Sequence, residues 1–316
     1  MKPRVLFLDT THPSLAEGLE ALGFDCSHVP ALRREEILPL LGDCEGIIVR
    51  SKIRLDREAL DQAGRLKFIG RVGAGMENID QAYAESKGIV CLNAPEGNRD
   101  AVGEQAIGML LVLFNHLRRA DREVRQGIWI REGNRGTEIG GKTIAIIGYG
   151  NMGSAFAEKL SGFGAEVIAY DKYKTGYSEM FVREVTMETV FQEADVVSLH
   201  VPLTGETLGL VNREWLSRFR KPITVINTSR GQCLDTAALM DAIDEGKVVG
   251  AALDVLEYEK LSFENLESES LPEPFRRLIN CDKVVLTPHI AGWTHESNLK
   301  MAKVLVEKIG KFWRNE

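Results

Sequence analysis

Four side chains with catalytic potential follow predicted strands in the second half of the chain. Each stands just past a short apolar run: Arg230, Asp254, Glu259 and His289. The carboxyl ends of parallel strands meet at one edge of an open α/β sheet, so we expect these residues to lie near one another. Histidine titrates near neutral pH and suits a general base, a carboxylate can orient its ring, and a guanidinium matches a substrate carboxylate. The set is suited to removing a proton from a hydroxyl that neighbours a carboxylate.

A glycine-rich turn in the same region has the pattern of a dinucleotide site. Residues 146–153 read IIGYGNMG, directly after an apolar run and before an alanine-rich helix. Gly148 permits the tight turn, Gly150 lets the backbone approach a diphosphate, and Gly153 allows close helix–strand packing. The amino end of the following helix offers N–H groups and a partial positive charge to the phosphates.

The next strand of this pattern ends at an acidic residue, Asp171. Its carboxylate would accept hydrogen bonds from the adenosine ribose and repel a 2′-phosphate, so NAD is favoured over NADP. Lys172 and Lys174 weaken this preference. A hydride acceptor beside a base and a cation indicates oxidation of a 2-hydroxy acid. A single arginine or histidine after a strand is more often structural. The catalytic interpretation therefore depends on finding these residues together at strand ends beside a dinucleotide site.

Two series of short apolar runs alternate with helical patterns and predict an α/β protein with mostly parallel sheets. The first series comprises Val5–Leu8, Ile47–Val49, Phe68–Ile69 and Ile89–Cys91. The second has the strand count of a complete doubly wound domain: Thr143–Ile147, Glu166–Tyr170, Val196–Leu199, Ile223–Asn227, Val248–Leu253 and Val284–Thr287.

Four further segments complete the predicted organisation. One long helical pattern covers residues 100–126, and the polar stretch 131–141 has the composition of a linker. The acidic stretch 257–277 is predicted as a surface loop, and residues 296–313 as an amphipathic helix. Residues 136–143, GTEIGGKT, fit the phosphate-loop pattern, but they follow polar residues and precede a strand, so we reject that match.

Composition excludes several classes of protein. The 316 residues suggest about two domains, and their ordinary apolar content excludes a disordered chain and a small disulfide scaffold. The net charge of −7 argues against binding to nucleic acid or to a membrane surface. Five widely spaced cysteines have no metal-ligand spacing, so we expect reduced thiols, no metal and a cytoplasmic protein. No apolar run reaches the length of a membrane span or of a signal peptide.

The chain resembles the D-isomer-specific 2-hydroxyacid dehydrogenase family over nearly its whole length. Within that family it is most similar to the short-type D-3-phosphoglycerate dehydrogenases. The motifs that carry the resemblance are residues 70–80 (GRVGAGMENID), 93–98 (NAPEGN), 148–153, 200–203 (HVPL), 227–231 (NTSRG), 254–259 and 287–292 (TPHIAG).

The resemblance implies a fold and a set of roles. It implies two Rossmann-like doubly wound domains: a discontinuous, flavodoxin-like substrate domain, residues 1–97 and 291–316, and an NAD-binding Rossmann domain, residues 98–290. Arg230, Glu259 and His289 match the catalytic triad, and Asp254 the residue that holds the nicotinamide carboxamide. The implied cofactor contacts are Gly148, Gly150, Asn151, Met152, Gly153, Asp171, Val201, Pro202, Thr228, Arg230, Asp254, His289 and Gly292.

The expected substrate is a small 2-hydroxy acid, most simply 3-phosphoglycerate, oxidised to 3-phosphohydroxypyruvate in serine biosynthesis. The residues assigned to it are Arg50, Ser51, Arg71, Val72, Gly73, Ala74, Gly75, Arg230 and His289. The resemblance places arginines matching Arg50 and Arg71 on the phosphate and backbone N–H groups of residues 72–75 on the carboxylate. It also implies a homodimer, with a tetramer as the alternative, in which Arg131 reaches the site of the other subunit.

Two other functions remain open from the sequence. A glyoxylate or hydroxypyruvate reductase, or another D-2-hydroxyacid dehydrogenase, would share the triad without needing the arginine cluster. A more remote alternative is an NAD-sensing scaffold similar to transcriptional corepressors of the same family.

Overall fold

Short aliphatic runs that are buried on both faces build two parallel sheets in this chain, and each sheet belongs to its own compact unit. The computed structural model describes residues 2–259 and 271–314. The terminal unit ends at Arg99 and resumes at Trp293, and the central unit runs from Asp100 to Gly292. These boundaries lie two residues beyond those expected at 97/98 and 290/291.

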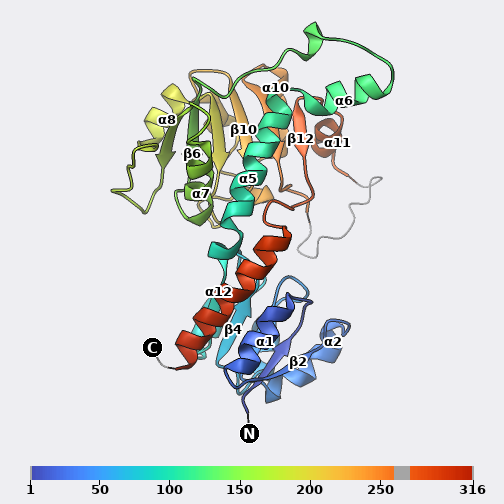
Figure 1. Ribbon diagram of the computed structural model, residues 1–316, viewed down its shortest axis with the longest axis vertical. Coiled ribbons are helices and arrows are strands. Elements are labelled where there is room, and N and C mark those ends of the chain that lie inside the picture. The colour runs from blue at the N-terminus through green and yellow to red at the C-terminus, as the bar shows by residue number, and fades with distance from the viewer. Residues whose placement is uncertain (1, 260–270, 315–316) are drawn as a thin grey trace. The chain divides into compact units, whose positions relative to one another are not determined.

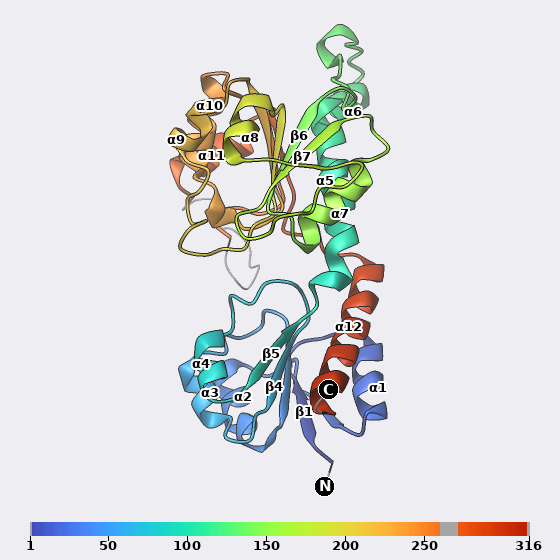
Figure 2. The same ribbon diagram turned by 90° about the vertical axis from the view of Figure 1, so that its left-hand side faces the viewer.

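The terminal unit contains five parallel strands in the order β2-β1-β3-β4-β5. They are β1 (Arg4–Phe7), β2 (Asp25–His28), β3 (Gly46–Val49), β4 (Phe68–Arg71) and β5 (Val90–Asn93). Side chains of the sheet alternate between two cores. One core packs against α1 (Pro13–Ala21) and α12 (His295–Trp313), and the other against α2 (Arg34–Ile37), the 3₁₀ helix Leu38–Asp43, α3 (Arg57–Gln62) and α4 (Gln81–Ser86). Figure 2 shows the two helical layers on opposite faces, which is the flavodoxin-like arrangement expected.

The central unit contains seven parallel strands in the order β12-β11-β10-β9-β6-β7-β8. They are β6 (Thr143–Ile147), β7 (Glu166–Tyr170), β8 (Arg183–Glu184), β9 (Val196–Leu199), β10 (Ile223–Asn227), β11 (Val248–Leu253) and β12 (Val284–Leu286). The strand order reverses between β6 and β9, as in dinucleotide-binding folds, so the predicted Rossmann domain is confirmed.

Helices cover both faces of the central sheet (Figure 1). Apolar residues of α5 (Pro95–Phe114) and α7 (Asn151–Leu160) form one core with the sheet. The opposite core contains residues of α8 (Met187–Glu193), α9 (Arg213–Ser217), α10 (Thr236–Asp244) and α11 (Glu273–Ile279). Two 3₁₀ turns, Glu132–Asn134 and Gly231–Cys233, complete the described elements of this unit.

The single long helix predicted for residues 100–126 is wrong. The structure has two helices, α5 and α6 (Leu117–Arg125), separated at His116, whose φ is 51°. The carbonyl of Phe114 accepts a hydrogen bond from the Thr137 N–H at 2.9 Å, so the returning chain satisfies the end of α5. Apolar periodicity gave no sign of this break, because the contact comes from residues more than twenty positions away.

Two edge strands and one helix also differ from the sequence-based expectations. The edge strands β2 and β8 were not predicted, because the segments Asp25–His28 and Arg183–Glu184 are mostly polar. Part of the acidic loop expected at 257–277 is instead α11, which begins with a proline in its first turn and buries Phe275 and Leu278. The remainder of that prediction, residues 260–270, lies outside the described residues.

Candidate active site

The carboxyl edge of the central sheet carries the loops that contain the predicted catalytic and cofactor residues. His289 Nδ1 lies 3.1 Å from Glu259 Oε1 and 3.2 Å from Oε2. The two side chains come from different loops, after β12 and β11, and both are about three-quarters buried. The carboxylate therefore holds the imidazole ring through Nδ1, so proton transfer would take place at the other ring nitrogen, Nε2.

His289 also has a rare backbone conformation. Among the non-glycine residues that the structure describes, only His116 and His289 have positive φ, and that of His289 is 55°. Its N–H donates to the carbonyl of Asp254 at 2.7 Å. Left-handed backbone is unfavourable for a residue with a Cβ, so surrounding contacts must hold the histidine in this turn.

Asp254 supplies those contacts. Its side chain is 1% exposed and accepts three hydrogen bonds: from Thr287 Oγ1 at 2.5 Å, from the Ile290 N–H at 2.9 Å and from the Ala291 N–H at 2.8 Å. The aspartate thus stabilises the turn at His289 through residues on both sides of it, a role that was not predicted from the sequence. Its expected contact with a nicotinamide carboxamide stays a prediction.

Arg230 follows β10 and is held by its own turn. Its Nη1 donates to the Ser229 carbonyl at 2.6 Å, and Asn227 Nδ2 donates to the Arg230 carbonyl at 3.0 Å. The next residue, Gly231, lies so close to the loop after β11 that a Cβ there would stand 1.9 Å from the Leu256 carbonyl oxygen. This close approach brings the arginine turn against the segment that ends in Glu259.

The glycine-rich turn has the shape that a dinucleotide requires. A Cβ on Gly148 would lie 2.6 Å from the His200 carbonyl oxygen, and one on Gly153 only 2.0 Å from the Gly148 carbonyl oxygen. A Cβ on Gly150 would meet open space. Gly150 is also the N-cap of α7 and no side chain caps the helix, so the N–H groups of its first turn, at Asn151 and Met152, remain for an anionic ligand.

Asp171 is oriented by main-chain donors at the end of β7. Its Oδ2 accepts from the Tyr149 N–H at 2.8 Å, and its Oδ1 accepts from the N–H groups of Tyr173 and Lys174 at 2.9 and 3.0 Å. An ionised carboxylate has further lone pairs for ribose hydroxyls. The residues present therefore fit an adenine dinucleotide.

The loop after β9 contributes a residue that was not predicted as a site residue, His200. Its Nε2 lies 2.8 Å from Ser198 Oγ, and its buried Nδ1 has no hydrogen-bond partner among the described residues. Burial lowers its pKa to about 3.

Thr228 Oγ1, after β10, is similarly buried without a partner in the described part of the chain. Val201 packs near Gly148, and the Pro202 carbonyl accepts from Thr207 Oγ1 at 2.6 Å.

The predicted substrate residues of the terminal unit follow β3 and β4. Arg50 and Ser51 come directly after β3, and the Arg50 N–H donates to Asp9 Oδ2 at 2.6 Å. Arg71 ends β4, and its side chain folds over Gly73, where a Cβ would clash with the guanidinium. The carbonyls of Gly73 and Ala74 accept from the Ala94 N–H at 2.9 Å and from Asn93 Nδ2 at 2.7 Å, so the 72–75 loop is anchored to the end of β5.

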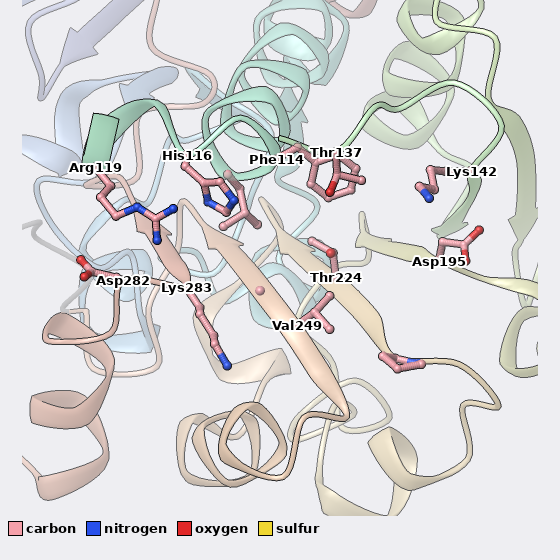
Figure 3. Close-up of a pocket in the computed structure, with 13 residues that line it drawn as sticks. Phe114, His116, Arg119, Thr137, Lys142, Asp195, Thr224, Val249, Asp282 and Lys283 are labelled. Carbon is pink, nitrogen blue, oxygen red and sulfur yellow. The ribbon is translucent and has the colours of Figure 1, made fainter. Parts of the chain in front are cut away.

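One cavity of the central unit does not coincide with these residues. It has a volume of about 300 Å³ and lies at the amino ends of the strands, and Figure 3 shows the residues that line it. Its lining includes Arg119, Lys142, Asp195, Asp282 and Lys283, a mixture of both charges. The carboxyl edge remains the candidate active site, because the His289–Glu259 pair lies there and parallel α/β sheets bind ligands at that edge.

Three structural observations concern other kinds of site. Within residues 2–259 and 271–314, no group of three or more histidine, cysteine or acidic side chains is arranged to hold a metal ion. None of the described helices is both long and apolar enough to cross a bilayer. All five cysteines are free thiols, and burial raises the pKa values of Cys26 and Cys91 to about 11 and that of Cys44 to about 12.

Comparison with known proteins identifies the class. The family model for the NAD-binding domain of D-isomer specific 2-hydroxyacid dehydrogenases matches residues 107–291. The chain belongs to this family, as the resemblance implied, and its cofactor is NAD. It is an NAD-dependent oxidoreductase of D-2-hydroxy acids.

Individual relatives differ in substrate. The chain is 35% identical to hydroxypyruvate reductase of Thermotoga maritima, covering 96% of this chain and 95% of that protein. It is also 35% identical to D-3-phosphoglycerate dehydrogenase of Archaeoglobus fulgidus, covering 97% of this chain but only 56% of that longer protein. The solved D-lactate dehydrogenase of Aquifex aeolicus, in complex with NAD and lactic acid, superimposes with a TM-score of 0.83 at 29% identity, covering 98% of this chain and 96% of that one.

Proposed function

We propose that the protein oxidises 3-phosphoglycerate to 3-phosphohydroxypyruvate with NAD. The observation that carries the oxidation is the His289–Glu259 pair at 3.1 Å, at the same sheet edge as a glycine-rich turn that fits the cofactor. The preference for a phosphorylated acid is supported by the arginines at the strand ends of the terminal unit, Arg50 and Arg71.

Each residue has a defined task in this proposal. His289 takes the proton of the 2-hydroxyl at Nε2, while Glu259 holds the ring through Nδ1 and stabilises its protonated form. Arg230 binds the substrate carboxylate through its planar fork, and the backbone of residues 72–75 contributes further N–H donors. When bound, NAD would supply the hydride acceptor for the carbon that carries the hydroxyl. In the reverse direction, His289 returns the proton to the carbonyl oxygen.

Hydroxypyruvate reduction is the second candidate. It is supported by the hydroxypyruvate reductase of Thermotoga maritima, which is 35% identical to this chain over 304 residues. Both candidates use the same triad, so the phosphate of the substrate distinguishes them.

The test is a steady-state comparison of 3-phosphoglycerate, glycerate, lactate and erythronate-4-phosphate with NAD. We expect kcat/KM for 3-phosphoglycerate to exceed that for glycerate by about 10- to 100-fold, the value of one or two charged hydrogen bonds to phosphate. The variant His289→Gln should lower turnover by at least about 100-fold while NADH still binds, as followed by NADH fluorescence. Equal activity on 3-phosphoglycerate and glycerate would refute the phosphate preference, and normal turnover of His289→Gln would remove the histidine from the base role.

We further propose that the protein works as a homodimer. Several of the large apolar side chains that are exposed in the described structure lie in one segment, which we call the apolar arm (residues 117–134): Leu117, Val124, Ile128, Trp129 and Ile130. Exposed apolar side chains gathered in one segment are typical of a protein–protein interface, so a second copy is the expected partner. Arg131 of the same segment is proposed to reach the substrate of that copy. A cytoplasmic location stays a prediction.

A further inference from the structure

Arg50 has an aromatic partner in the terminal unit that none of its assigned roles explains. Its guanidinium carbon lies 4.0 Å from the centre of the Trp293 ring. The indole is 60% exposed, so burial of the ring does not account for its position. At this distance a cation is attracted to the face of an indole, the strongest of the aromatic partners.

Hydrogen bonds fix the backbone at or next to each member of the pair. The Arg50 N–H donates to Asp9 Oδ2 at 2.6 Å, which fixes the backbone at the end of β3. Trp293 directly precedes Thr294, the N-cap of α12. There the Ser297 N–H donates to Thr294 Oγ1 and the Thr294 N–H donates to Ser297 Oγ, each at 3.0 Å. This capping box fixes the backbone that carries the indole.

The charge of Arg50 is compensated only in part within the described structure. Its side chain donates only a long hydrogen bond of 3.4 Å, from Nη1 to the Thr10 carbonyl, and no described carboxylate forms an ion pair with it. Burial lowers the pKa of the guanidinium, and the charge of Asp9 acts in the opposite direction. A partly desolvated cation without a paired anion is a favourable place for an anionic ligand.

We propose that Trp293 is a positioning residue that orients Arg50 toward an anionic group of the substrate, its phosphate if the proposed function holds, on which this inference rests. A guanidinium 4.0 Å from the ring centre is held over the indole face, and arginine planes favour stacking on such faces. A guanidinium stacked in this way directs its N–H donors outward along its plane, where they can meet two oxygens of one phosphate or carboxylate. Without the indole, the long arginine side chain must lose rotamer freedom each time the substrate binds.

The experiment compares Trp293→Leu with Trp293→Phe. For 3-phosphoglycerate we expect Trp293→Leu to raise KM about 3- to 10-fold, the range of a partly desolvated cation–π contact, with a change in kcat below about twofold. Trp293→Phe keeps an aromatic face and should recover most of the loss. The matched control is Tyr83→Leu, which removes the ring beneath Arg57, another arginine of the terminal unit, at 5.2 Å and should leave KM unchanged.

A double-mutant cycle with Arg50→Ala separates positioning from a general structural effect. If Trp293 acts through Arg50, Trp293→Leu should have little further effect on KM in the Arg50→Ala background. Equal effects in both backgrounds, or equal KM values for Trp293→Leu and Trp293→Phe, would overturn the inference.

The cycle is measured with whichever 2-hydroxy acid the wild type turns over, so the two proposals fail in different ways. A wild type without preference for 3-phosphoglycerate refutes the proposed substrate, whereas an uncoupled cycle refutes the role of Trp293. Inorganic phosphate, used as a competitive inhibitor, measures binding of the anion alone, because it has no hydroxyl that the enzyme can oxidise. Its inhibition constant should rise in Trp293→Leu and in Arg50→Ala if Arg50 binds the phosphate.

Discussion

At the scale of single residues, His200 connects the cofactor turn to the core of the central unit. Its carbonyl packs against Gly148, its ring centroid lies 5.4 Å from that of Phe156, and its Nε2 contacts Ser198 Oγ. The Nδ1 atom of the ring is buried without a partner among the described residues, and desolvation of the protonated form lowers the pKa from 6.5 to about 3. The histidine is therefore neutral in the folded protein over the whole physiological range.

This burial predicts a specific pH dependence of stability. Below about pH 6.5 the unfolded chain binds a proton at residue 200 and the folded protein does not, down to about pH 3. The contribution of His200 to the free energy of unfolding is thus complete above pH 6.5 and falls by about 1.4 kcal/mol for each pH unit below it. We expect His200→Asn to be less stable at pH 7 but to lose less stability between pH 6.5 and 5, as measured by urea unfolding.

An exposed histidine provides the control for that measurement. His295, in the first turn of α12, is solvent-exposed, and His295→Asn should follow the wild-type curve. Parallel curves for the wild type and His200→Asn would contradict the assignment of His200 as a neutral, buried group.

At the scale of elements, the β10 and β11 loops, which carry Arg230 and Glu259 of the proposed triad, pack closely on each other at Gly231. Gly231→Ala would place a Cβ 1.9 Å from the Leu256 carbonyl oxygen, so the two loops must separate. We expect a loss of stability of about 1–3 kcal/mol, typical of overpacking, and a fall in kcat/KM of at least about tenfold, because Arg230 and Glu259 move apart. Thermal unfolding and steady-state kinetics check both effects.

Gly108→Ala is the matched control for this substitution. Gly108 lies on the exposed side of α5, where a Cβ meets nothing within 4 Å, and alanine is the better helix former. This variant should be as active as the wild type and at least as stable. If Gly231→Ala behaved in the same way, the loop contact would have no role in placing the catalytic residues.

Some of these elements are readable from the sequence and others are not. Strands such as Thr143–Ile147 are buried on both faces, so their continuous apolar runs predict them, and the polar residues that follow each run predict the active edge. The polar edge strand β2 has no such run. The break at His116, the bracing of the histidine turn by Asp254 and the stacking of Trp293 on Arg50 all depend on tertiary contacts between distant segments. The spacing of residues along the sequence does not predict such contacts.

At the scale of the whole molecule, the apolar arm is the feature that a single chain does not explain. The Trp129 side chain is 78% exposed, and Ile128 and Ile130 beside it are 41% and 50% exposed. The segment is nevertheless held in place, since Asn134 Nδ2 donates to Glu123 Oε2 at 2.6 Å and to the Ile130 carbonyl at 2.9 Å. A preorganised apolar surface of this kind lowers the entropic cost of binding a partner.

The assembly prediction follows from that surface. We expect the wild type to sediment as a dimer at micromolar concentration and Trp129→Glu to shift it toward the monomer, because a charge at a buried interface position costs several kcal/mol. Met180→Glu changes another fully exposed apolar side chain outside the arm and should leave the dimer intact. If Arg131 of one copy reaches the substrate of the other, the Trp129→Glu monomer should also show a raised KM for 3-phosphoglycerate, and Arg131→Ala should raise that KM while the protein stays dimeric. A wild type that sediments as a monomer over the same concentrations would refute the proposal that the apolar arm forms a dimer interface.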